Sequence, residues 1–317
     1  MENLEILLSI CIPTYNRASA LHKNLSSIFE EYGEVHNQIE LIVSDNCSED
    51  NTEQVVNNFI QNGLPIKYIK NNLNIGMDKN FEQCYKVGKG KYILVLGDDD
   101  FIIKGKLPVL LDYLKSGDYG LVHLKTNSVS YLKYEKFTDS EKYLENISIW
   151  ITYITSNIVN SKFIMDYNFN KYNGTLLTIV PLYINTVLEC EENLIINEKI
   201  FSDGVEQSGG FNFFEVFVQN YLKIWKDFNL NNSISNKLFY NIKRDLLKNF
   251  LIPSVIGFCV DKSTLNYSLN GSFSYVLKHY SFNLYFYPKT FIALLRILYH
   301  KHIKIFIEKK TFSSKNI

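Results

Sequence analysis

The amino-acid sequence predicts an α/β protein, with a mostly parallel sheet flanked by helices and a helical C-terminal region. Two observations predict this class. Over about the first 125 residues, short apolar segments alternate with amphipathic segments of helical spacing, which is the pattern of strand–helix–strand units with parallel strands. Beyond residue 231, apolar residues recur at helical spacing almost to the end of the chain.

The N-terminal elements follow from the spacing of their apolar residues. Strands are expected at 6–12, 39–44, 66–69 and 91–96, because these short runs are apolar enough to be buried in a parallel sheet. Helices are expected at 19–31, 48–62 and 77–87, and the first of them carries Leu21, Leu25 and Ile28 on one face. Gly63 and Gly88 follow the second and third helices, as glycine commonly does at a helix end.

The later elements are less regular. Residues 127–143 are polar and rich in tyrosine, which favours an irregular segment or a hairpin. Helices are expected at 175–189, where Pro181 should break or kink the helix, and at 212–228 and 233–250. These patterns divide the chain into three regions, 1–125, 126–230 and 231–317.

Composition excludes several classes of protein. The 317 residues carry 33 basic and 33 acidic side chains, so net charge gives no case for binding nucleic acid. The five cysteines are scattered without a C-x-x-C pair, which argues against a disulfide framework or a zinc ribbon and favours the cytoplasm. The N-terminus has acidic residues instead of a basic signal-peptide region, and no apolar run reaches the roughly 18 residues that a membrane span needs.

Three consecutive carboxylates, Asp98, Asp99 and Asp100, end the apolar run "ILVLG". Carboxylates this close cannot all remain ionised without a counter-charge or raised pKa values. Mg²⁺ and Mn²⁺ prefer oxygen ligands, and Mg²⁺ is often bound by one or two carboxylates together with substrate phosphates. The triplet therefore predicts a divalent-metal site that would stabilise a leaving nucleotide; a solvated turn is the alternative.

Polar stretches follow the other three predicted strands, and parallel strands would bring all four to one edge of the sheet, where ligands collect. In "PTYNR", Tyr15 offers a stacking face and Arg17 a cation for phosphate. In "SDNCSED", Ser48 and Asp50 suffice to cap the following helix. Asp45 is then left without a structural role and is free to accept hydrogen bonds from a base or ribose.

Together these stretches resemble a known family. "LSICIPTYNRASALHKNLSSI", "IELIVSDNCSEDNT" and "NNLNIGMDKNFEQCYKVGKGKYILVLGDDDFI" are similar to the nucleotide-sugar-binding half of a family 2 glycosyltransferase with the Rossmann-like GT-A fold, over residues 8 to about 114. The pairing of "SDNCSED" with "LGDDD" resembles bacterial abequosyltransferase-like polysaccharide transferases. The resemblance implies a nucleoside-diphosphate sugar donor, Mn²⁺ or Mg²⁺, and a glycan or lipid-linked acceptor in bacterial surface polysaccharide synthesis.

The resemblance also implies roles for individual residues. With this resemblance, residues 1–125 are expected to be the nucleotide-sugar-binding half, 126–230 the acceptor-binding half and 231–317 a helical C-terminal region, for which the tail discussed below suggests membrane association. Many relatives read L-D-x-D-D where this chain has Gly97 in place of the first aspartate. The implied donor-binding residues are Pro13, Thr14, Tyr15, Arg17, Asp45, Asn74, Gly76, Lys79, Asn80 and Asp98, and the implied metal ligands are Asp98, Asp99 and Asp100.

The catalytic base remains open in the sequence. Many inverting relatives carry a Glu-Asp pair well beyond the triplet, and "YNGTLLTIVPLYINTVLECEEN" lacks one. Loose candidates for the base are Asp166, Glu189, Glu191, Glu192 and Asp203. His123 ends a predicted strand just past the triplet, and a hydrogen-bonded core histidine is the favoured interpretation.

The tail has a basic composition that fits two structures equally well. Residues 289–310 hold six Lys or Arg against one acidic residue, with Phe291, Leu294, Leu295 and Leu298 at helical spacing. A basic amphipathic helix can lie on an anionic membrane, or it can pack on the protein with its basic face in solvent.

Two other functions are weighed against the transferase. A sugar-phosphate nucleotidyltransferase would normally need a glycine-rich loop after the first strand, and "PTYNRAS" contains no glycine. A non-catalytic sugar-nucleotide or glycan-binding protein would explain the missing Glu-Asp pair, but it gives no reason for the acidic triplet.

Overall fold

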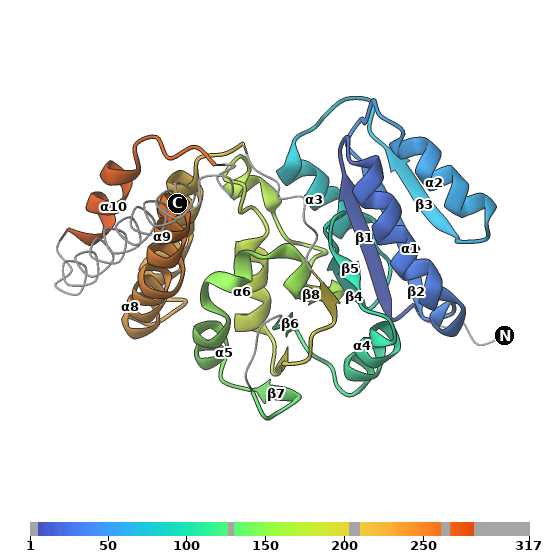
Figure 1. Ribbon diagram of the computed structural model, residues 1–317. Helices are drawn as coiled ribbons and strands as arrows, with labels where there is room; N and C mark the ends of the chain where they lie inside the picture. Colours follow the sequence, from blue (N-terminus) through green and yellow to red (C-terminus); the bar gives the residue numbers. More distant parts are fainter. Residues whose placement is uncertain (1–5, 126–129, 203–209, 261–266, 282–317) are drawn as a thin grey trace, which may run out of the picture. The chain divides into compact units, whose positions relative to one another are not determined.

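The computed structural model describes residues 6–125, 130–202, 210–260 and 267–281 (Figure 1). They fall in two compact units, Met1–Gln207 and Ser208–Ile317. The first unit holds all the predicted donor-binding and metal-binding residues. The functional division of the chain at residues 125 and 230 stays a prediction, because a compact unit does not reveal what each part binds.

The first unit is built on an eight-stranded sheet in the order β3-β2-β1-β4-β8-β6-β9-β7. The strands β3, β2, β1 and β4 are parallel, β8 runs antiparallel to both of its neighbours, β6 and β9 are parallel, and β7 is antiparallel to β9. The strands span Leu8–Thr14 (β1), Ile39–Asp45 (β2), Ile66–Lys70 (β3), Tyr92–Val95 (β4), Leu121–Leu124 (β6), Tyr134–Phe137 (β7), Asn157–Asn160 (β8) and Asn193–Ile196 (β9). A separate two-stranded sheet pairs Phe101–Ile102 (β5) with Phe201–Ser202 (β10).

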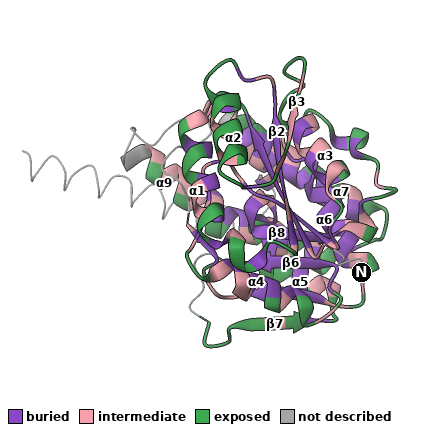
Figure 2. Ribbon diagram, turned by 90° about the vertical axis from the view of Figure 1, so that its right-hand side faces the viewer, coloured by how far each residue is buried: buried purple, intermediate pink, exposed green. Residues whose placement is uncertain are grey.

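Helices pack against the sheet because each carries one apolar face. The helices are Ala18–Val35 (α1), Thr52–Gln61 (α2), Met77–Val87 (α3), Lys106–Lys115 (α4), Ser140–Ile147 (α5) and Val180–Glu189 (α6). Short 3₁₀ turns lie at Ser148–Thr152 (η1), Ile154–Ser156 (η2), Ser161–Phe163 (η3) and Phe169–Tyr172 (η4). Along β1, Leu8, Ile10 and Ile12 join the core that includes α1 and α4, whereas Cys11 faces α3 and bonds the carbonyl of Cys84. In Figure 2 the central strands are buried, the edge strand β7 is largely exposed, and the outer faces of α1 and α2 are exposed.

The predicted strands and helices of the first 100 residues are confirmed, with ends shifted by a few residues. Two later expectations are corrected. Residues 140–143 begin helix α5 instead of lying in an irregular segment, because Asp139 accepts the N–H of Lys142 and so caps that helix. Pro181 does not break a helix; it lies in the first turn of α6, where a missing N–H costs nothing.

The described part of the second unit is helical, as predicted. Its elements are Tyr221–Leu230 (α7), Asn236–Asp245 (α8), Ile252–Val260 (α9) and Ser272–Tyr280 (α10), with π-helical turns at Glu215–Asn220 (η5) and Leu246–Leu251 (η6). Phe213 lies within 5.7 Å of five other aromatic rings, which fixes the packing of η5 against η6 and α9. Among the described residues, no helix is long and apolar enough to cross a membrane. The basic tail predicted at 289–310 lies outside the described residues.

Candidate functional site

The acidic triplet lies in the turn between β4 and β5, and an arginine supplies its counter-charge. One guanidinium nitrogen of Arg17 lies 2.7 Å from Oδ1 of Asp98, and another lies 2.8 Å from Oδ2 of Asp99. The hydroxyl of Thr14 donates to Oδ2 of Asp98 at 2.8 Å. The end of β1 therefore binds the triplet directly, as expected for polar groups at the carboxyl ends of neighbouring parallel strands.

Burial makes the ionised form of Asp98 costly. Asp98 is 4 % exposed, and this burial raises its pKa to about 6, although the Arg17 charge and the Thr14 hydrogen bond oppose the rise. The neighbouring charges of Asp99 and Asp100 raise it further. A cation near the triplet therefore stabilises the ionised form of Asp98, and Arg17 fills this role in the structure.

The carboxylate of Asp100 is held in a cage of hydroxyl groups. The hydroxyl of Tyr153 donates to its Oδ1 at 2.8 Å, and that of Thr155 donates to its Oδ2 at 2.5 Å. Asn24 donates to the carbonyl oxygens of Gly97 and Asp100, which fixes the turn itself. Sequence reasoning missed Tyr153 and Thr155, since they lie around short 3₁₀ turns that carry no periodic pattern.

Gly97 has a steric reason to replace the aspartate of the L-D-x-D-D pattern. A Cβ atom at this position would lie 2.7 Å from Oδ2 of Asp100 and 3.4 Å from Oδ1 of Asp99. The backbone N–H of Gly97 also donates to the Thr155 hydroxyl at 2.9 Å, so the turn and the cage around Asp100 are one structure.

We expect Gly97→Ala to lower the free energy of unfolding by about 1–3 kcal/mol, because Asp100 is held by two hydroxyls and cannot move aside freely. Urea unfolding measures the change. Gly33→Ala is the matched control, since a Cβ there meets nothing within 4 Å and alanine favours the helix. Equal stability changes in the two variants would contradict the steric explanation.

The loops after β1 and β2 are joined by hydrogen bonds. The N–H of Asn16 donates to the Ser48 hydroxyl at 2.8 Å, the N–H of Glu49 donates to Oδ1 of Asn16 at 2.8 Å, and the N–H of Ala18 donates to Asp50 at 2.9 Å. Both loops also contain a non-glycine residue with positive φ, Asn16 at 53° and Cys47 at 70°. Such backbone strain persists where surrounding contacts fix it. The two loops therefore form one rigid surface beside the triplet.

The expectation that Asp45 lacks a structural role is wrong. Its Oδ1 accepts the N–H of Ser48 at 2.8 Å, and its Oδ2 accepts the hydroxyl of Tyr68 at 2.6 Å. Asp45 is completely buried. The burial of the Tyr68 hydroxyl, together with its hydrogen bond to Asp45, raises the pKa of Tyr68. The helix begins only at Thr52, so Ser48 lies in the loop and takes its support from Asp45.

The third polar stretch joins the same edge through a network of amides. The side chain of Asn46 donates to Oδ1 of Asn74 at 2.8 Å, which also accepts the N–H of Gly76 at 2.9 Å. Gly76 has φ of 82° and begins α3, as predicted for a tight turn. Asn80 accepts the Ser44 hydroxyl at 2.6 Å, so it fixes the end of β2.

The structure brings most of the predicted donor-binding residues to one edge. Thr14 and Arg17 meet the triplet, Pro13 ends β1, and Asp45, Asn74, Gly76 and Asn80 surround the end of β2. Tyr15 is 43 % exposed beside them. Lys79 instead binds Glu82 and the side chain of Asn170.

The structure does not bring the described candidates for the catalytic base to this edge. Glu189, Glu191 and Glu192 precede β9, whose amino end lies at the opposite edge of the sheet, since β9 is parallel to β6. Asp166 follows the end of the antiparallel strand β8, which also lies there. Asp203 lies outside the described residues. It follows Ser202 in the sequence, and Ser202 pairs with Phe101, the residue after the triplet.

His123 is a core histidine, as favoured from the sequence. Only 1 % of it is exposed, and its Nδ1 lies 2.9 Å from Oδ1 of Asn157. Burial lowers its pKa to about 4. It belongs to the sheet and makes no contact with the triplet.

The low pKa of His123 predicts acid sensitivity. Below the unfolded-state pKa of about 6.5, the unfolded chain binds a proton that the folded chain refuses until about pH 4, so stability falls as pH falls across this window. Between pH 7 and 4, we expect wild type to lose up to about 3 kcal/mol more than His123→Gln. Denaturant unfolding at several pH values measures it, with the exposed His36→Gln as control. Parallel pH profiles for wild type and His123→Gln would contradict the prediction.

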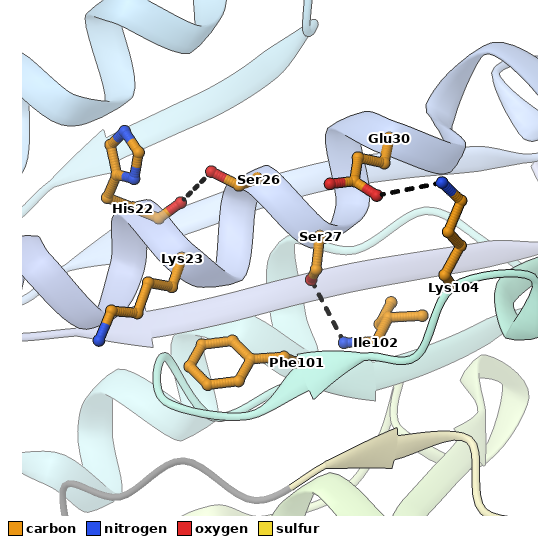
Figure 3. Close-up of a pocket in the computed structure, with 8 residues that line it drawn as sticks. All are labelled: His22, Lys23, Ser26, Ser27, Glu30, Phe101, Ile102 and Lys104. Carbon is orange, nitrogen blue, oxygen red and sulfur yellow. Dashed lines mark hydrogen bonds and ion pairs between the residues drawn. The ribbon is translucent and has the colours of Figure 1, made fainter.

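A pocket of about 520 Å³ lies between α1 and β5 (Figure 3). Its lining residues are His22, Lys23, Ser26, Ser27, Glu30, Phe101, Ile102 and Lys104. The hydroxyl of Ser27 accepts the N–H of Ile102 at 3.3 Å, which ties β5 to α1. None of the residues predicted to bind donor or metal lines this pocket, so it is separate from the predicted site.

The donor set at the triplet fits a divalent cation held by one carboxylate and a substrate. Asp99 is the most exposed of the three, with 22 % of its side chain accessible, and its Oδ1 accepts no hydrogen bond from the described residues. The oxygens of Asp98 and Asp100 are already engaged. No cluster of three or more His, Cys, Asp or Glu side chains suited to a metal occurs in the described ranges.

Comparison with models of protein families shows to which family the chain belongs. The family model described as "Glycosyl transferase family 2" matches residues 9–174, slightly more than half of the chain. The chain belongs to glycosyl transferase family 2. The matched residues include the acidic triplet, Arg17 and the joined loops after β1 and β2, so the family's shared region is the one that builds this edge of the sheet.

Curated relatives match about a third of the chain. The chain is 38% identical over 112 residues to abequosyltransferase RfbV of Salmonella typhimurium, covering 35% of this chain and 33% of the relative. It is 33% identical over 111 residues to the GalNAc(5)-diNAcBac-PP-undecaprenol beta-1,3-glucosyltransferase of Campylobacter jejuni, covering 35% of each. The matches thus span about a third of these relatives' length.

Solved structures support the GT-A fold of this family 2 chain. The structure of S. aureus TarS 1-349 in complex with UDP superposes with a TM-score of 0.60 at 17% identity, covering 86% of this chain and 78% of that chain. A mannosyltransferase from Pyrobaculum calidifontis, in complex with GDP-Man and Mn2+, gives a TM-score of 0.55 at 10% identity, covering 93% and 86%.

Proposed function

We propose that this family 2 protein transfers a sugar from a nucleoside-diphosphate sugar to a hydroxyl of a glycan or lipid-linked acceptor in bacterial surface polysaccharide synthesis. The observation that carries the proposal is the cluster of Arg17, Thr14 and the acidic triplet at the carboxyl edge of the parallel sheet. The named activities of the two curated relatives support the same class of reaction.

The chain's own residues would share the charge of the donor. Asp99 would hold Mn²⁺ or Mg²⁺ through its free Oδ1, while Asp98 and Asp100 stay fixed by Thr14 and the hydroxyl cage. When bound, the cation supplies Lewis-acid stabilisation of the negative charge on the leaving diphosphate. The guanidinium of Arg17 would place positive charge beside the diphosphate.

The nucleoside would lie against the joined loops. The exposed ring of Tyr15 offers a stacking surface beside the amides of the third polar stretch. Because Asp45 is completely buried, its predicted contact with the nucleoside would require a ligand to displace the Tyr68 hydroxyl. Asp203 stays one of the candidate bases from the sequence and lies outside the described residues.

The proposal is tested with the purified chain, a panel of nucleotide sugars, and Mn²⁺ or EDTA. We expect one nucleotide sugar to raise the melting temperature in a metal-dependent way, and slow hydrolysis of that donor to accompany it. Binding without turnover, also in the presence of bacterial lipid-linked glycan, would favour a sugar-nucleotide-binding protein. If the chain neither binds nor turns over any donor of the panel, the proposed function is contradicted.

The basic tail supports a peripheral membrane contact, consistent with a lipid-linked acceptor. We expect the full chain to sediment with vesicles of phosphatidylcholine and phosphatidylglycerol at low salt, and the Lys301→Glu/Lys304→Glu variant to sediment less, because each basic residue near an anionic surface contributes about 1 kcal/mol. Vesicles of phosphatidylcholine alone are the control. Equal sedimentation of both proteins with anionic vesicles would show that the tail does not bind them through charge.

A further inference from the structure

Asp78, in the first turn of α3, is a buried carboxylate whose hydrogen bonds hold a distant segment. Its Oδ2 accepts the backbone N–H of Gly174 at 2.7 Å and that of Leu176 at 3.1 Å, and the N–H of Thr178 also favours its ionised form. Asp78 is 5 % exposed, and its Oδ1 is buried and has no hydrogen-bond partner among the described residues. Burial raises the pKa of Asp78, so the structure keeps this carboxylate at a cost.

The segment that Asp78 holds, residues 173–178, has a strained backbone. Gly174 has φ of 82°, which suits glycine, but Leu176 has φ of 60°. A leucine in the left-handed region costs about 1–2 kcal/mol. Such a conformation persists only where its surroundings fix it. The backbone N–H of Leu176 donates a charge-assisted hydrogen bond to Asp78, and this bond provides the support.

The same turn of α3 also holds the carboxyl edge of the sheet where the nucleotide sugar is proposed to bind. We call this edge, around the ends of β1 and β2, the donor edge. Two positions after Asp78, Asn80 accepts the hydroxyl of Ser44 at 2.6 Å and donates to the Ser44 carbonyl at 3.0 Å, directly before Asp45 at the end of β2. Lys79 adds a hydrogen bond of 2.9 Å to Asn170 in η4. One helical turn thus connects the end of β2 with the segment that leads from η4 into α6.

We propose that Asp78 is a positioning residue that couples the segment 173–178 to the donor edge, so that nucleotide bound beside β2 and α3 orders this segment. The proposal rests on the proposed function, since it needs a nucleotide at that edge. Asn173 and Gly174 are exposed at the tip of the segment. An acceptor that approaches a donor at this edge would therefore meet a backbone whose position depends on Asp78.

Amide hydrogen exchange of the full chain, with and without a panel of nucleoside diphosphates and Mn²⁺, tests the coupling. In wild type, a nucleotide that slows exchange in residues 44–50 and 71–80 should also slow it in 173–178. In Asp78→Ala, protection at the donor edge should remain, and protection of 173–178 should fall by about tenfold or more with the loss of charge-assisted hydrogen bonds. Asp78→Asn retains an oxygen acceptor and should give an intermediate value.

Asp139→Ala is the matched control, because Asp139 also accepts a backbone N–H, that of Lys142 at 3.0 Å, but caps α5 instead. This variant should lose stability yet keep the nucleotide-dependent protection of 173–178, which separates coupling from general destabilisation. Protection of the donor edge without any change in 173–178, or full protection of that segment in Asp78→Ala, would overturn the coupling alone. Absence of protection at 44–50 and 71–80 with every nucleotide would overturn the proposed function as well.

Discussion

Asp99→Ala is expected to lower metal-dependent turnover of the donor by about 10³-fold, which corresponds to about 4 kcal/mol of transition-state stabilisation. Asp99 is the carboxylate of the triplet with an oxygen left for a cation, because Arg17 uses only Oδ2. Hydrolysis of the donor at saturating Mn²⁺ measures the effect. The fold should survive, with stability within about 1 kcal/mol of wild type, since the pair with Arg17 is partly exposed.

Two comparison variants sharpen this result. Asp112→Ala removes an exposed carboxylate whose partner Lys115 lies 3.7 Å away, and it should leave turnover unchanged. Asp100→Ala should lower both turnover and the free energy of unfolding, the latter by about 2–3 kcal/mol, because the hydroxyls of Tyr153 and Thr155 lose their acceptor. Turnover of Asp99→Ala at the level of Asp112→Ala would remove Asp99 from the metal site.

Arg17→Ala is expected to lower the free energy of unfolding by about 2–4 kcal/mol in the absence of metal. The substitution leaves the buried Asp98 beside two other carboxylates with only the Thr14 hydroxyl as a direct partner. Removing one member of a buried ion pair typically costs 3–5 kcal/mol, and the partial exposure of Arg17, whose side chain is 23% accessible, reduces that figure. Urea unfolding in EDTA measures the loss.

Metal should partly restore Arg17→Ala. Because a dication can take the place of the guanidinium, we expect Mn²⁺ to raise the melting temperature of Arg17→Ala more than that of wild type in the absence of donor. Lys104→Ala is the control, since Lys104 is 86% exposed and lies 3.9 Å from its partner Glu30. Stability of Arg17→Ala equal to that of Lys104→Ala would show that the triplet does not depend on this counter-charge.

The sequence was most informative where each strand is buried on both faces. The runs that became β1, β2 and β4 are apolar without alternation, and such runs followed by polar loops are typical of parallel sheets. The same reasoning correctly placed Thr14, Arg17 and the triplet at one edge. Pairing order beyond β4 was not predictable, since the antiparallel β8 follows two irregular 3₁₀ turns.

The errors concern partners that are distant in sequence. Capping rules account for neighbours along the chain, so they left Asp45 unused, whereas Tyr68 from β3 supplies its second hydrogen bond. The hydrogen bonds of Tyr153 and Thr155 to Asp100 also join residues that are distant in sequence. The same is true of the hydrogen bonds that Asp78 accepts from residues 174 and 176. Polar contacts over such separations carry no periodic signal in one sequence.

The contact between Arg17 and Asp98 spans 81 residues, and it has a consequence for synthesis of the protein. During translation, a nascent chain that has not yet emerged beyond β4 has Arg17 but lacks the carboxylates of the triplet. The cluster of Arg17 with the triplet therefore cannot form on the ribosome before that point. Contacts of such sequence separation form late because the chain entropy must be lost first. Truncated translation products that end before residue 98 should therefore present an unneutralised Arg17 and have no affinity for metal at this place.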